Sequence, residues 1–352
     1  MQKKITIFSI KSLSGKPADG IDNVTIAVFS RMDPDKIVFF TEAPDSFTAR
    51  GSIVKIKTLG ILGKIFLMRR LRPEYLFGNG SVVDIPFIMC KPSGTRYVIA
   101  WHTLLLRNEN YWRVRTPWFV RRFVFNSAFS VLCVSEYIAS TVRRYFPSAR
   151  ITAILNGVDT ALFDPVKKNT GYLKEKYALD CARPIVAYVG TLVPRKRPDI
   201  FFACARRVPE ADFVMVGRAV PPDDFLTEMR TIPNIRWIPS MSREDVAVFL
   251  ASSSVFLFPS INEPAAAVIL ESMASGCVPV VSQSGGNGEF FTDGLSGFAV
   301  PCAAGEVYNC IQKIKLLLSD AAKRAGMAES ARHEAVLHSW DTVSLAYADY
   351  FK

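Results

Sequence analysis

The sequence lacks long apolar runs, repeats and low-complexity tracts. No uninterrupted run reaches the roughly 18 apolar residues that a membrane-spanning helix needs, so we expect no transmembrane segment. Near the N-terminus, the apolar residues 5–10 are too few for a signal peptide and alternate like a first β-strand. We therefore expect a cytoplasmic protein.

Cysteine and histidine are also sparse. The seven cysteines form no C-x-x-C pair and leave one over, which fits buried thiols in a reducing compartment better than disulfides or a zinc site. Two of the three histidines, His333 and His338, lie near the C-terminus, where we expect structural roles. Asp33 and Asp35 flank a proline and are interpreted as a turn. The sequence therefore predicts no metal site.

The chain has 352 residues, more than one hydrophobic core usually serves, so we expect two domains. Alternating strand and helix patterns in both halves predict an α/β fold with parallel, doubly wound sheets. The expected strands are residues 5–10, 37–40, 75–77, 97–101, 130–134, 150–155, 185–189, 212–216, 235–238, 255–258, 278–282 and 297–300, and residues 306–322 and 331–352 are expected to be helical. Turn residues and composition divide the chain into a domain over 1–163, a linker over 164–183, a domain over 184–330 and a final segment over 331–352.

The net positive charge belongs to one half of the chain. Residues 1–165 hold 23 Lys and Arg against 12 Asp and Glu, whereas residues 166–352 hold 20 of each, so the net charge of +11 belongs to the N-terminal half. Residues 59–72 and 107–125 mix arginine with aromatic and aliphatic residues, as segments at an anionic membrane surface do. The alternatives are ordinary amphipathic helices with their apolar faces in the core, or a single-stranded nucleic-acid surface, for which no binding motif is present.

Two carboxylates, Glu263 and Glu271, lie eight residues apart around the expected start of a helix at Pro264. At 1.5 Å of rise per residue they are expected about 10 to 12 Å apart, roughly the reach from the sugar to the ribose of a nucleotide diphosphate sugar. Helix N-terminal amides between them favour a phosphate, and the methyl side chains of residues 265–267 let a diphosphate approach the backbone. The alternative is a surface helix with two solvated glutamates.

Four further motifs accompany residues 262–282 in a fixed order: residues 156–159, 188–199, 214–217 and 285–289. Together these motifs resemble the retaining glycosyltransferases of family 4. The resemblance is strong over residues 150–300 and thinner in the N-terminal half. It implies the GT-B fold, in which two Rossmann-like domains face each other across a ligand-binding cleft and a final helix returns to the first domain. It also implies that no metal is essential.

The resemblance implies roles for individual residues. Lys196 is expected to neutralise the leaving diphosphate, Glu263 to bind donor-sugar hydroxyls, and Glu271 to accept from the ribose hydroxyls. His102 is expected to contact the sugar or to position the transition state, although a lone histidine after a strand is more often structural. The other expected donor-binding residues are Gly20, Gly190, Thr191, Arg195, Gly217, Arg218, Ile238, Ala265, Ala266 and Ala267.

Three positions depart from the family pattern. Thr191 stands where an arginine is usual, so either Arg195 or Arg197 supplies that charge or the diphosphate is bound more weakly. Ala265 and Ala266 replace a larger apolar residue and a glycine or proline, so contacts to the sugar are expected to differ there.

The resemblance implies a retaining, metal-independent transfer of a sugar from a UDP- or GDP-linked donor to an acceptor hydroxyl. The basic, aromatic N-terminal half favours a lipid-linked or saccharide acceptor of cell-envelope polysaccharide, lipopolysaccharide or glycolipid assembly, and a peripheral position on the inner face of the membrane. No nucleic-acid partner is expected. The alternatives are a soluble acceptor, or a catalytically weak scaffold that binds membrane or polyanion.

Overall fold

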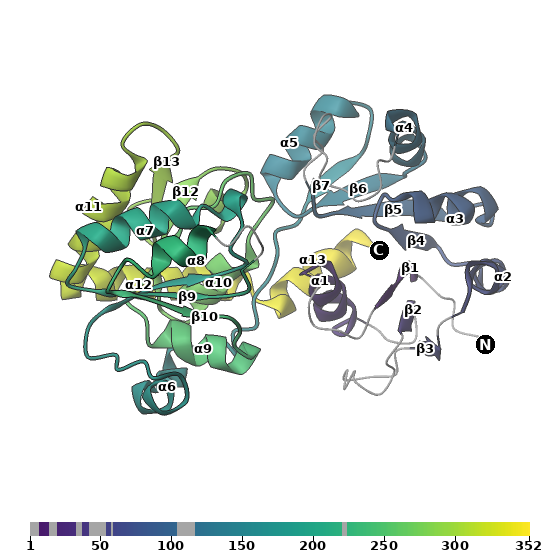
Figure 1. Cartoon of the computed structure of the whole chain (residues 1–352). Coiled ribbons are helices and arrows are strands. Elements are labelled where there is room, and N and C mark those ends of the chain that lie inside the picture. The colour runs from purple at the N-terminus through teal and green to yellow at the C-terminus, as the bar shows by residue number, and fades with distance from the viewer. Residues whose placement is uncertain are drawn as a thin grey trace. The chain divides into compact units, whose positions relative to one another are not determined.

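The computed structural model describes residues 7–13, 20–32, 37–41, 54–57, 59–103, 117–219 and 224–352. The chain divides into two compact units (Figure 1). Unit 1 comprises Met1–Asn156 and Trp340–Lys352, and unit 2 comprises Gly157–Ser339. This division assigns the expected linker, residues 164–183, to unit 2.

Unit 1 is built on a seven-stranded parallel sheet in the order β3-β2-β1-β4-β5-β6-β7. The strands are β1 (Ile7–Leu13), β2 (Ile37–Thr41), β3 (Val54–Lys57), β4 (Tyr75–Gly78), β5 (Arg96–Trp101), β6 (Ser130–Cys133) and β7 (Ile151–Ala153). The helices are α1 (Gly20–Phe29), α2 (Ile61–Leu71), η3 (Val82–Asp84), α3 (Ile85–Cys90), α4 (Trp118–Asn126), α5 (Glu136–Tyr145) and α13 (Trp340–Tyr350). Strand β3, four residues with two lysines, was not predicted because so short an alternation is a weak signal.

Unit 2 is built on a six-stranded parallel sheet in the order β10-β9-β8-β11-β12-β13. The strands are β8 (Ile185–Val189), β9 (Asp212–Val216), β10 (Ile235–Ile238), β11 (Val255–Phe258), β12 (Val278–Gln283) and β13 (Phe298–Pro301). The helices are η4 (Pro165–Lys167), α6 (Thr170–Tyr177), η5 (Pro194–Lys196), α7 (Pro198–Arg207), α8 (Asp224–Met229), α9 (Arg243–Ala251), α10 (Ala267–Ala274), η6 (Asn287–Phe290), α11 (Glu306–Ser319) and α12 (Ala321–Leu337). The expected α/β class with parallel, doubly wound sheets is confirmed.

The C-terminal helices differ from the prediction. Residues 306–322 do not form one helix, because the side chain of Asp320 accepts a hydrogen bond from Lys323 N (2.8 Å) and so begins a new helix, α12. Residues 331–352 also do not form one helix. The chain breaks at Ser339, which pairs with Val158 as a β-bridge, and the last helix, α13, then begins at Trp340.

The core of unit 1 includes its last helix. Trp340, Val343, Tyr347 and Phe351 are buried against strand residues such as Ile7. Burying an aromatic or aliphatic side chain of this size contributes roughly 1.5 to 3 kcal/mol. The last turns of the chain therefore belong to the fold of unit 1.

In unit 2 the strand order reverses between β8 and β11, which are neighbours in the sheet but not in sequence. In an open α/β sheet, ligands bind outside the carboxyl ends of the strands at such a reversal. The residues that follow β8, β9 and β11 are therefore where a site is expected. None of the helices in the described parts of the chain has the length and apolar character that crossing a membrane requires.

Candidate functional site

Two glycines bring the backbone together at the carboxyl ends of β8 and β9. Gly190 has φ 156° and Gly217 has φ 143°, and a Cβ at Gly217 would overlap the carbonyl group of Gly190. Only glycine allows so close an approach. Next to them, Gly217 N donates to Ile238 O (3.0 Å) and Trp237 Nε1 donates to Gly217 O (2.8 Å). These contacts hold Gly217 and Ile238 beside each other at the strand ends, while Arg218 is exposed.

Glu263 is the centre of a buried polar cluster. Its Oε1 forms an ion pair with Arg195 Nη1 (2.5 Å), is in contact with Lys196 Nζ, and accepts a hydrogen bond from Ser260 Oγ (2.6 Å). The side chains of Glu263 and Lys196 are only 7% and 15% exposed, so both charges depend on these partners. The structure thus brings together three residues that the sequence had placed in one site.

The charge state of this cluster follows from its geometry. Burial alone raises the pKa of Glu263, but the positive charges of Lys196 and Arg195 outweigh it, and the net effect lowers the pKa. Glu263 is therefore ionised at neutral pH. Burial lowers the pKa of Lys196, although the charge of Glu263 opposes the shift. Lys196 Nζ also lies 4.6 Å from the centre of the Phe258 ring at the end of β11, which adds a cation–π contact.

Arg197 does not belong to this cluster. Its Nη1 pairs with Glu306 Oε2 (2.6 Å), and the other oxygen of Glu306 accepts from Ser282 Oγ (2.5 Å). Of the two arginines considered as substitutes for the missing one at Thr191, the structure places Arg195 beside Lys196. The carbonyl oxygen of Thr191 accepts from the buried Tyr188 hydroxyl (3.3 Å).

The segment that follows Glu263 is not helical at first, which corrects the prediction. Helix α10 begins at Ala267 rather than at Pro264. Glu263 pairs with Gly285 as a β-bridge, and its carbonyl oxygen accepts from Gly286 N (2.9 Å), so its backbone is extended. The separation of the two glutamates is therefore not set by one continuous helix.

Asn287 holds the start of α10. Ala266 N donates to Asn287 Oδ1 (3.2 Å), while Asn287 Nδ2 is buried and has no hydrogen-bond partner among the described residues. A buried amide with an unused donor is costly unless a ligand or water completes it. Ala265 and Ala266 are 9% exposed, and Ala267 is half-buried.

Glu271 lies one turn into α10. Its Oε1 is 3.3 Å from Arg243 Nη2, and the side chain is 18% exposed. Burial raises the pKa of Glu271 above its ordinary value, although Arg243 opposes the shift. A carboxylate in this position can accept hydrogen bonds from hydroxyl groups of a ligand.

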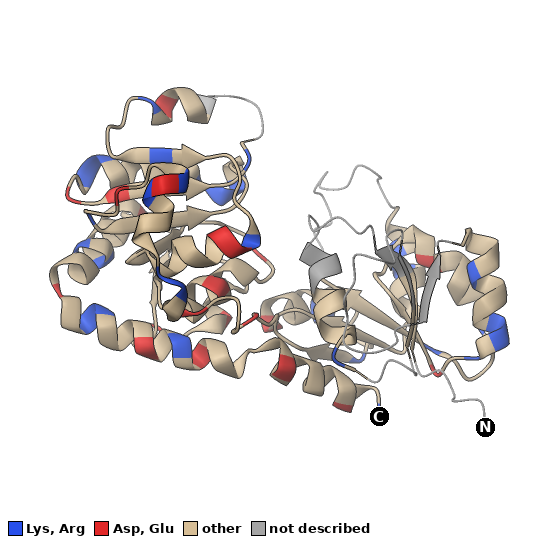
Figure 2. Ribbon diagram, turned by 90° about the horizontal axis from the view of Figure 1, so that it is seen from below, with Lys and Arg blue, Asp and Glu red and all other residues tan. Residues whose placement is uncertain are grey.

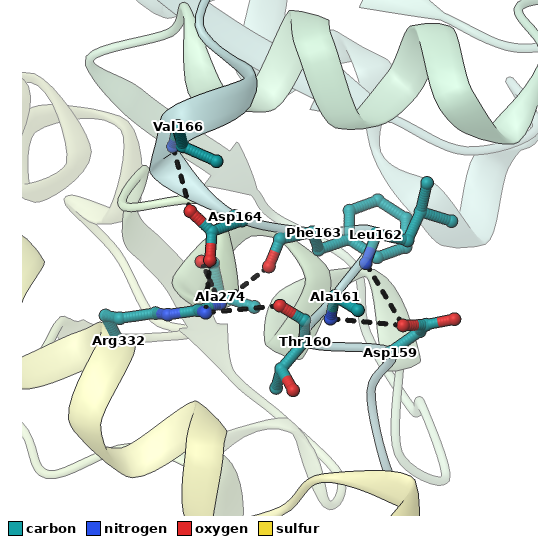
Figure 3. Close-up of polar contacts among 9 residues, drawn as sticks. All are labelled: Asp159, Thr160, Ala161, Leu162, Phe163, Asp164, Val166, Ala274 and Arg332. Carbon is teal, nitrogen blue, oxygen red and sulfur yellow. Dashed lines mark hydrogen bonds and ion pairs between the residues drawn. The ribbon is translucent and has the colours of Figure 1, made fainter.

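The carboxyl end of α10 is anchored by one side chain, Arg332 of α12 (Figure 3). Its Nη1 donates to Ala274 O (2.7 Å) and Phe163 O (2.6 Å), and its Nη2 pairs with Asp164 Oδ2 (2.6 Å) and donates to Thr160 O (3.2 Å). A cation at a helix C-terminus stabilises the helix. Arg332 therefore ties α10 to the segment that opens unit 2.

Two expected site residues lie in unit 1. His102 directly follows β5 and is half-buried. Gly20, expected in the loop after the first strand, is instead the first residue of α1. Asp33 and Asp35 and much of the basic segment 107–125 lie outside the described residues. No group of metal-ligating side chains gathers within the described ranges.

Sequence reasoning missed Ser260 and Asn287. Ser260 is fully buried and lies three residues before Glu263, a spacing that was available in the sequence. Asn287 accepts a hydrogen bond from Ala266 N, which is 21 residues away in the sequence, so only the fold brings the two residues together.

Comparison with known proteins gives the family. A family model described as glycosyl transferases group 1 matches residues 172–334, and one described as glycosyltransferase family 4 matches residues 27–162. A sulfoquinovosyl transferase of Arabidopsis thaliana is 24% identical over 282 residues, which are 77% of this chain and 55% of that protein. A GDP-mannose-dependent α-(1-6)-phosphatidylinositol monomannoside mannosyltransferase of Mycolicibacterium smegmatis is 30% identical over 235 residues, 62% of this chain and 60% of that protein. The chain spans about half the length of the curated relatives it matches.

Solved structures agree on the fold. Anabaena HepE, in complex with UDP and glucose, superimposes with a TM-score of 0.77 at 18% identity, over 98% of this chain and 99% of that one. The two family models together cover most of both units. The chain therefore belongs to the group 1 glycosyl transferases of glycosyltransferase family 4, with the GT-B fold.

Proposed function

We propose that the protein transfers a glycosyl unit from a nucleotide diphosphate sugar to an acceptor hydroxyl with retention of anomeric configuration. The observation that carries the proposal is the cluster of Arg195, Lys196 and Glu263 after β8 and β11, at the reversal of strand order. Two cations and one carboxylate in a buried position suit a ligand with a diphosphate next to a sugar.

Each part of the donor has a candidate partner in unit 2. Lys196 and Arg195 would bind the diphosphate, aided by the amino end of α10, where the backbone is flanked only by methyl groups. Glu263 would bind sugar hydroxyls and Glu271 the ribose hydroxyls. The base would lie against Gly217 and against Trp237 and Ile238, which are both hydrogen-bonded to Gly217.

The contacts of Glu263 support a retaining transfer in which no carboxylate acts as the nucleophile. Its Oε1 is shared by Arg195, Lys196 and Ser260, so the carboxylate is a weak nucleophile. The departing diphosphate would instead accept the proton of the acceptor hydroxyl on the same face of the sugar. The two cations would stabilise the charge that develops on it, as a metal ion does in other transferases. His102 remains the candidate in unit 1 for contacting the sugar.

Both UDP and GDP remain candidates for the donor nucleotide. HepE was crystallised with UDP and glucose, whereas the Mycolicibacterium relative is GDP-mannose-dependent. Gly217 and Ile238 lie side by side at the proposed base position. Backbone groups there would contact either a uracil or a guanine.

The surface of unit 1 supports a peripheral position of the protein on the inner face of the membrane. In that position the acceptor would be a lipid-linked or saccharide molecule of cell-envelope assembly. Leu62, Phe66, Met89 and Phe119 are 82%, 71%, 74% and 73% exposed. They lie on α2, α3 and α4, of which α2 contacts α3, and η3 contacts both α3 and α4. We call these four residues the apolar patch. The name of the Mycolicibacterium relative likewise includes a phosphatidylinositol acceptor.

Two of the helices that carry the apolar patch also carry positive charge. Helix α2 ends in Arg69 and Arg70, and α4 carries Arg121. Figure 2 colours the lysines and arginines of both units blue. Each basic residue near an anionic membrane contributes about 1 kcal/mol and each large apolar side chain about 1.5 to 3 kcal/mol when buried. Together these residues fit a peripheral membrane contact.

The direct test is release of nucleotide diphosphate from a panel of UDP- and GDP-linked sugars, with bacterial lipid extracts and soluble saccharides as acceptors. We expect one donor to be consumed in the presence of an acceptor from the lipid extract. The new linkage should have the same anomeric configuration as the donor. Inversion of the anomeric centre would contradict retention. No turnover of any donor by wild type would favour the scaffold alternative.

A further inference from the structure

Unit 1 contains a cavity that the proposed function does not use. It has a volume of about 550 Å³ and is lined by the ends of α4 and α5 and by the turns that lead into β6 and β7. It therefore lies at the amino ends of these strands. Ligands of doubly wound sheets bind at the carboxyl ends, so this cavity is on the opposite edge of the sheet.

The cavity is lined by hydrogen-bond donors and by no carboxylate. The polar side chains that line it are those of Arg122, Asn126, Tyr145, Ser148 and Arg150. Within the part of the chain that the structure describes, neither Arg122 nor Arg150 forms an ion pair, whereas the nearby Arg143 pairs with Glu136. Two unneutralised guanidinium groups thus share one concave surface.

Aromatic packing fixes one of these arginines. The guanidinium carbon of Arg150 lies 4.9 Å from the centre of the Phe129 ring, and that of Arg96 lies 4.8 Å from the same ring. Arg96 is held in turn by Tyr75, whose hydroxyl accepts from Arg96 Nη1 (3.1 Å). Arg150 is therefore partly ordered before any ligand binds, and a third positive charge stands close by.

The helix ends at the cavity do not cancel this charge. The carboxyl ends of α4 and α5 each carry a partial charge of about −0.5, against +2 from Arg122 and Arg150. Several of the terminal carbonyl groups are also hydrogen-bonded within the chain, since Phe123 O accepts from Ser127 Oγ (2.7 Å) and Val142 O accepts from Phe146 N (2.8 Å). The cavity keeps a net positive potential.

We propose that this cavity is an accessory binding site for a phosphate group. Guanidinium pairs with adjacent hydroxyl and amide donors match the oxygens of a phosphate. The volume exceeds that of a phosphate alone and leaves room for the glycerol or sugar that carries it. The phosphate comes either from a soluble molecule or from a lipid headgroup, and Arg122 shares α4 with the exposed Phe119.

The test compares the full-length wild type with the double variant Arg122→Gln/Arg150→Gln. A matched control, Arg144→Gln/Arg207→Gln, removes two exposed arginines that do not line the cavity. Inorganic phosphate and glycerol 3-phosphate are titrated by calorimetry, and vesicles of phosphatidylcholine with and without phosphatidic acid are tested by flotation. Because every protein keeps Lys196 and Arg195, phosphate binding at the donor site is the same in all three.

We expect the double variant to bind at least one of these probes about tenfold more weakly than wild type, with the control within about twofold. Weaker binding of the two soluble probes identifies a soluble phosphate ligand. A loss confined to vesicles with phosphatidic acid identifies a lipid headgroup. Equal binding of every probe by wild type and the double variant, or an equal loss in the control, overturns the proposal. As a second variant, Ser148→Asp should weaken the same probe, because it adds negative charge to the cavity wall.

Discussion

Glu263 pairs with the two cations that we expect to bind the donor diphosphate. Arg195 and Lys196 both contact its Oε1. A diphosphate would therefore compete with Glu263 for these cations. When Arg195 and Lys196 bind the diphosphate, the carboxylate of Glu263 would be free to bind sugar hydroxyls. Binding of the phosphates and release of Glu263 are thus expected to be coupled.

This coupling predicts the effect of Glu263→Gln. Removing the negative charge leaves the volume unchanged and frees Arg195 and Lys196, so bare nucleotide diphosphate should bind as tightly as to wild type or up to about tenfold more tightly. Glycosyl transfer should fall about 100-fold or more, because the sugar loses its charged partner. Calorimetry with the bare nucleotide and a nucleotide-release assay measure the two effects. Weaker binding of the bare nucleotide would place Glu263 elsewhere.

The neighbouring arginines should behave differently from each other. Arg195→Gln should weaken donor binding about tenfold, because a charged contact to phosphate is lost. Arg197→Gln should change donor binding little but should lower stability by about 2 kcal/mol, because it leaves the buried Glu306 without its cation. Calorimetry and thermal unfolding of both variants separate the two roles. The reverse pattern would show that Arg197 is the phosphate ligand.

At the scale of elements, most strands could be predicted from the sequence. β8, β9 and β11 are short, mostly apolar runs that are buried along most of their length, and a buried parallel strand has that pattern. β3 was missed and the C-terminal helices were joined wrongly. Their ends depend on local contacts, such as the β-bridge at Ser339, that periodicity does not encode.

In the candidate site, too, the sequence predicted individual residues but not the contacts between distant segments. The sequence motifs predicted site roles for Lys196, Glu263 and Glu271, and in the structure Lys196 contacts Glu263. The helical spacing assumed between the two glutamates was wrong, because the backbone of Glu263 pairs with Gly285 and the helix starts later. A contact between segments 22 residues apart is a product of the fold and leaves no local signal.

A second polar cluster docks α6 onto α9. Asp245 accepts hydrogen bonds from Tyr172 (2.5 Å), Lys176 (2.9 Å) and Tyr177 (2.7 Å). Although burial alone raises the pKa of Asp245, these hydrogen bonds outweigh it and hold the pKa below its ordinary value of 3.8. Its contribution to stability is therefore present above pH 3.8 and is lost as the pH falls below that value.

This predicts that Asp245→Asn lowers the free energy of unfolding at pH 7 by about 1 kcal/mol, a modest value because the lysine partner is exposed to solvent. The difference between variant and wild type should shrink as the pH falls below 3.8, because Asp245 is protonated first in the unfolded state and only at lower pH in the folded state. Urea unfolding across this pH range measures it. A difference that stays constant with pH would show that Asp245 acts by packing alone.

At the scale of the whole molecule, the excess positive charge of residues 1–165 coincides with the exposed apolar patch of unit 1. The sequence predicted basic segments with aromatic residues but not which of their side chains are buried. In α2, for example, Met68 is buried whereas Leu62 and Phe66 are exposed. Exposure depends on which face of each helix packs on the sheet.

The membrane contact predicts a vesicle-binding defect. Leu62→Ser/Phe66→Ser should weaken binding to anionic vesicles about 100-fold or more at low salt, because about 3 kcal/mol or more of apolar burial is lost. The control Leu295→Ser/Tyr308→Ser changes two exposed residues of unit 2 and should bind as wild type does. Flotation over a salt series measures both. Equal binding by all three proteins would rule the patch out, and no binding by wild type would rule out the membrane contact.

Unit 2 is proposed to bind a nucleotide diphosphate sugar through Lys196. The most direct measurement is calorimetric titration of UDP, GDP and their sugars into wild type, Lys196→Ala and the control Lys168→Ala, which changes an exposed lysine of the same unit. We expect one nucleotide to bind wild type and the control alike and to bind Lys196→Ala about tenfold or more weakly. Equal affinity of all three proteins for that nucleotide, or no binding of any nucleotide by wild type, would contradict the proposed role of Lys196.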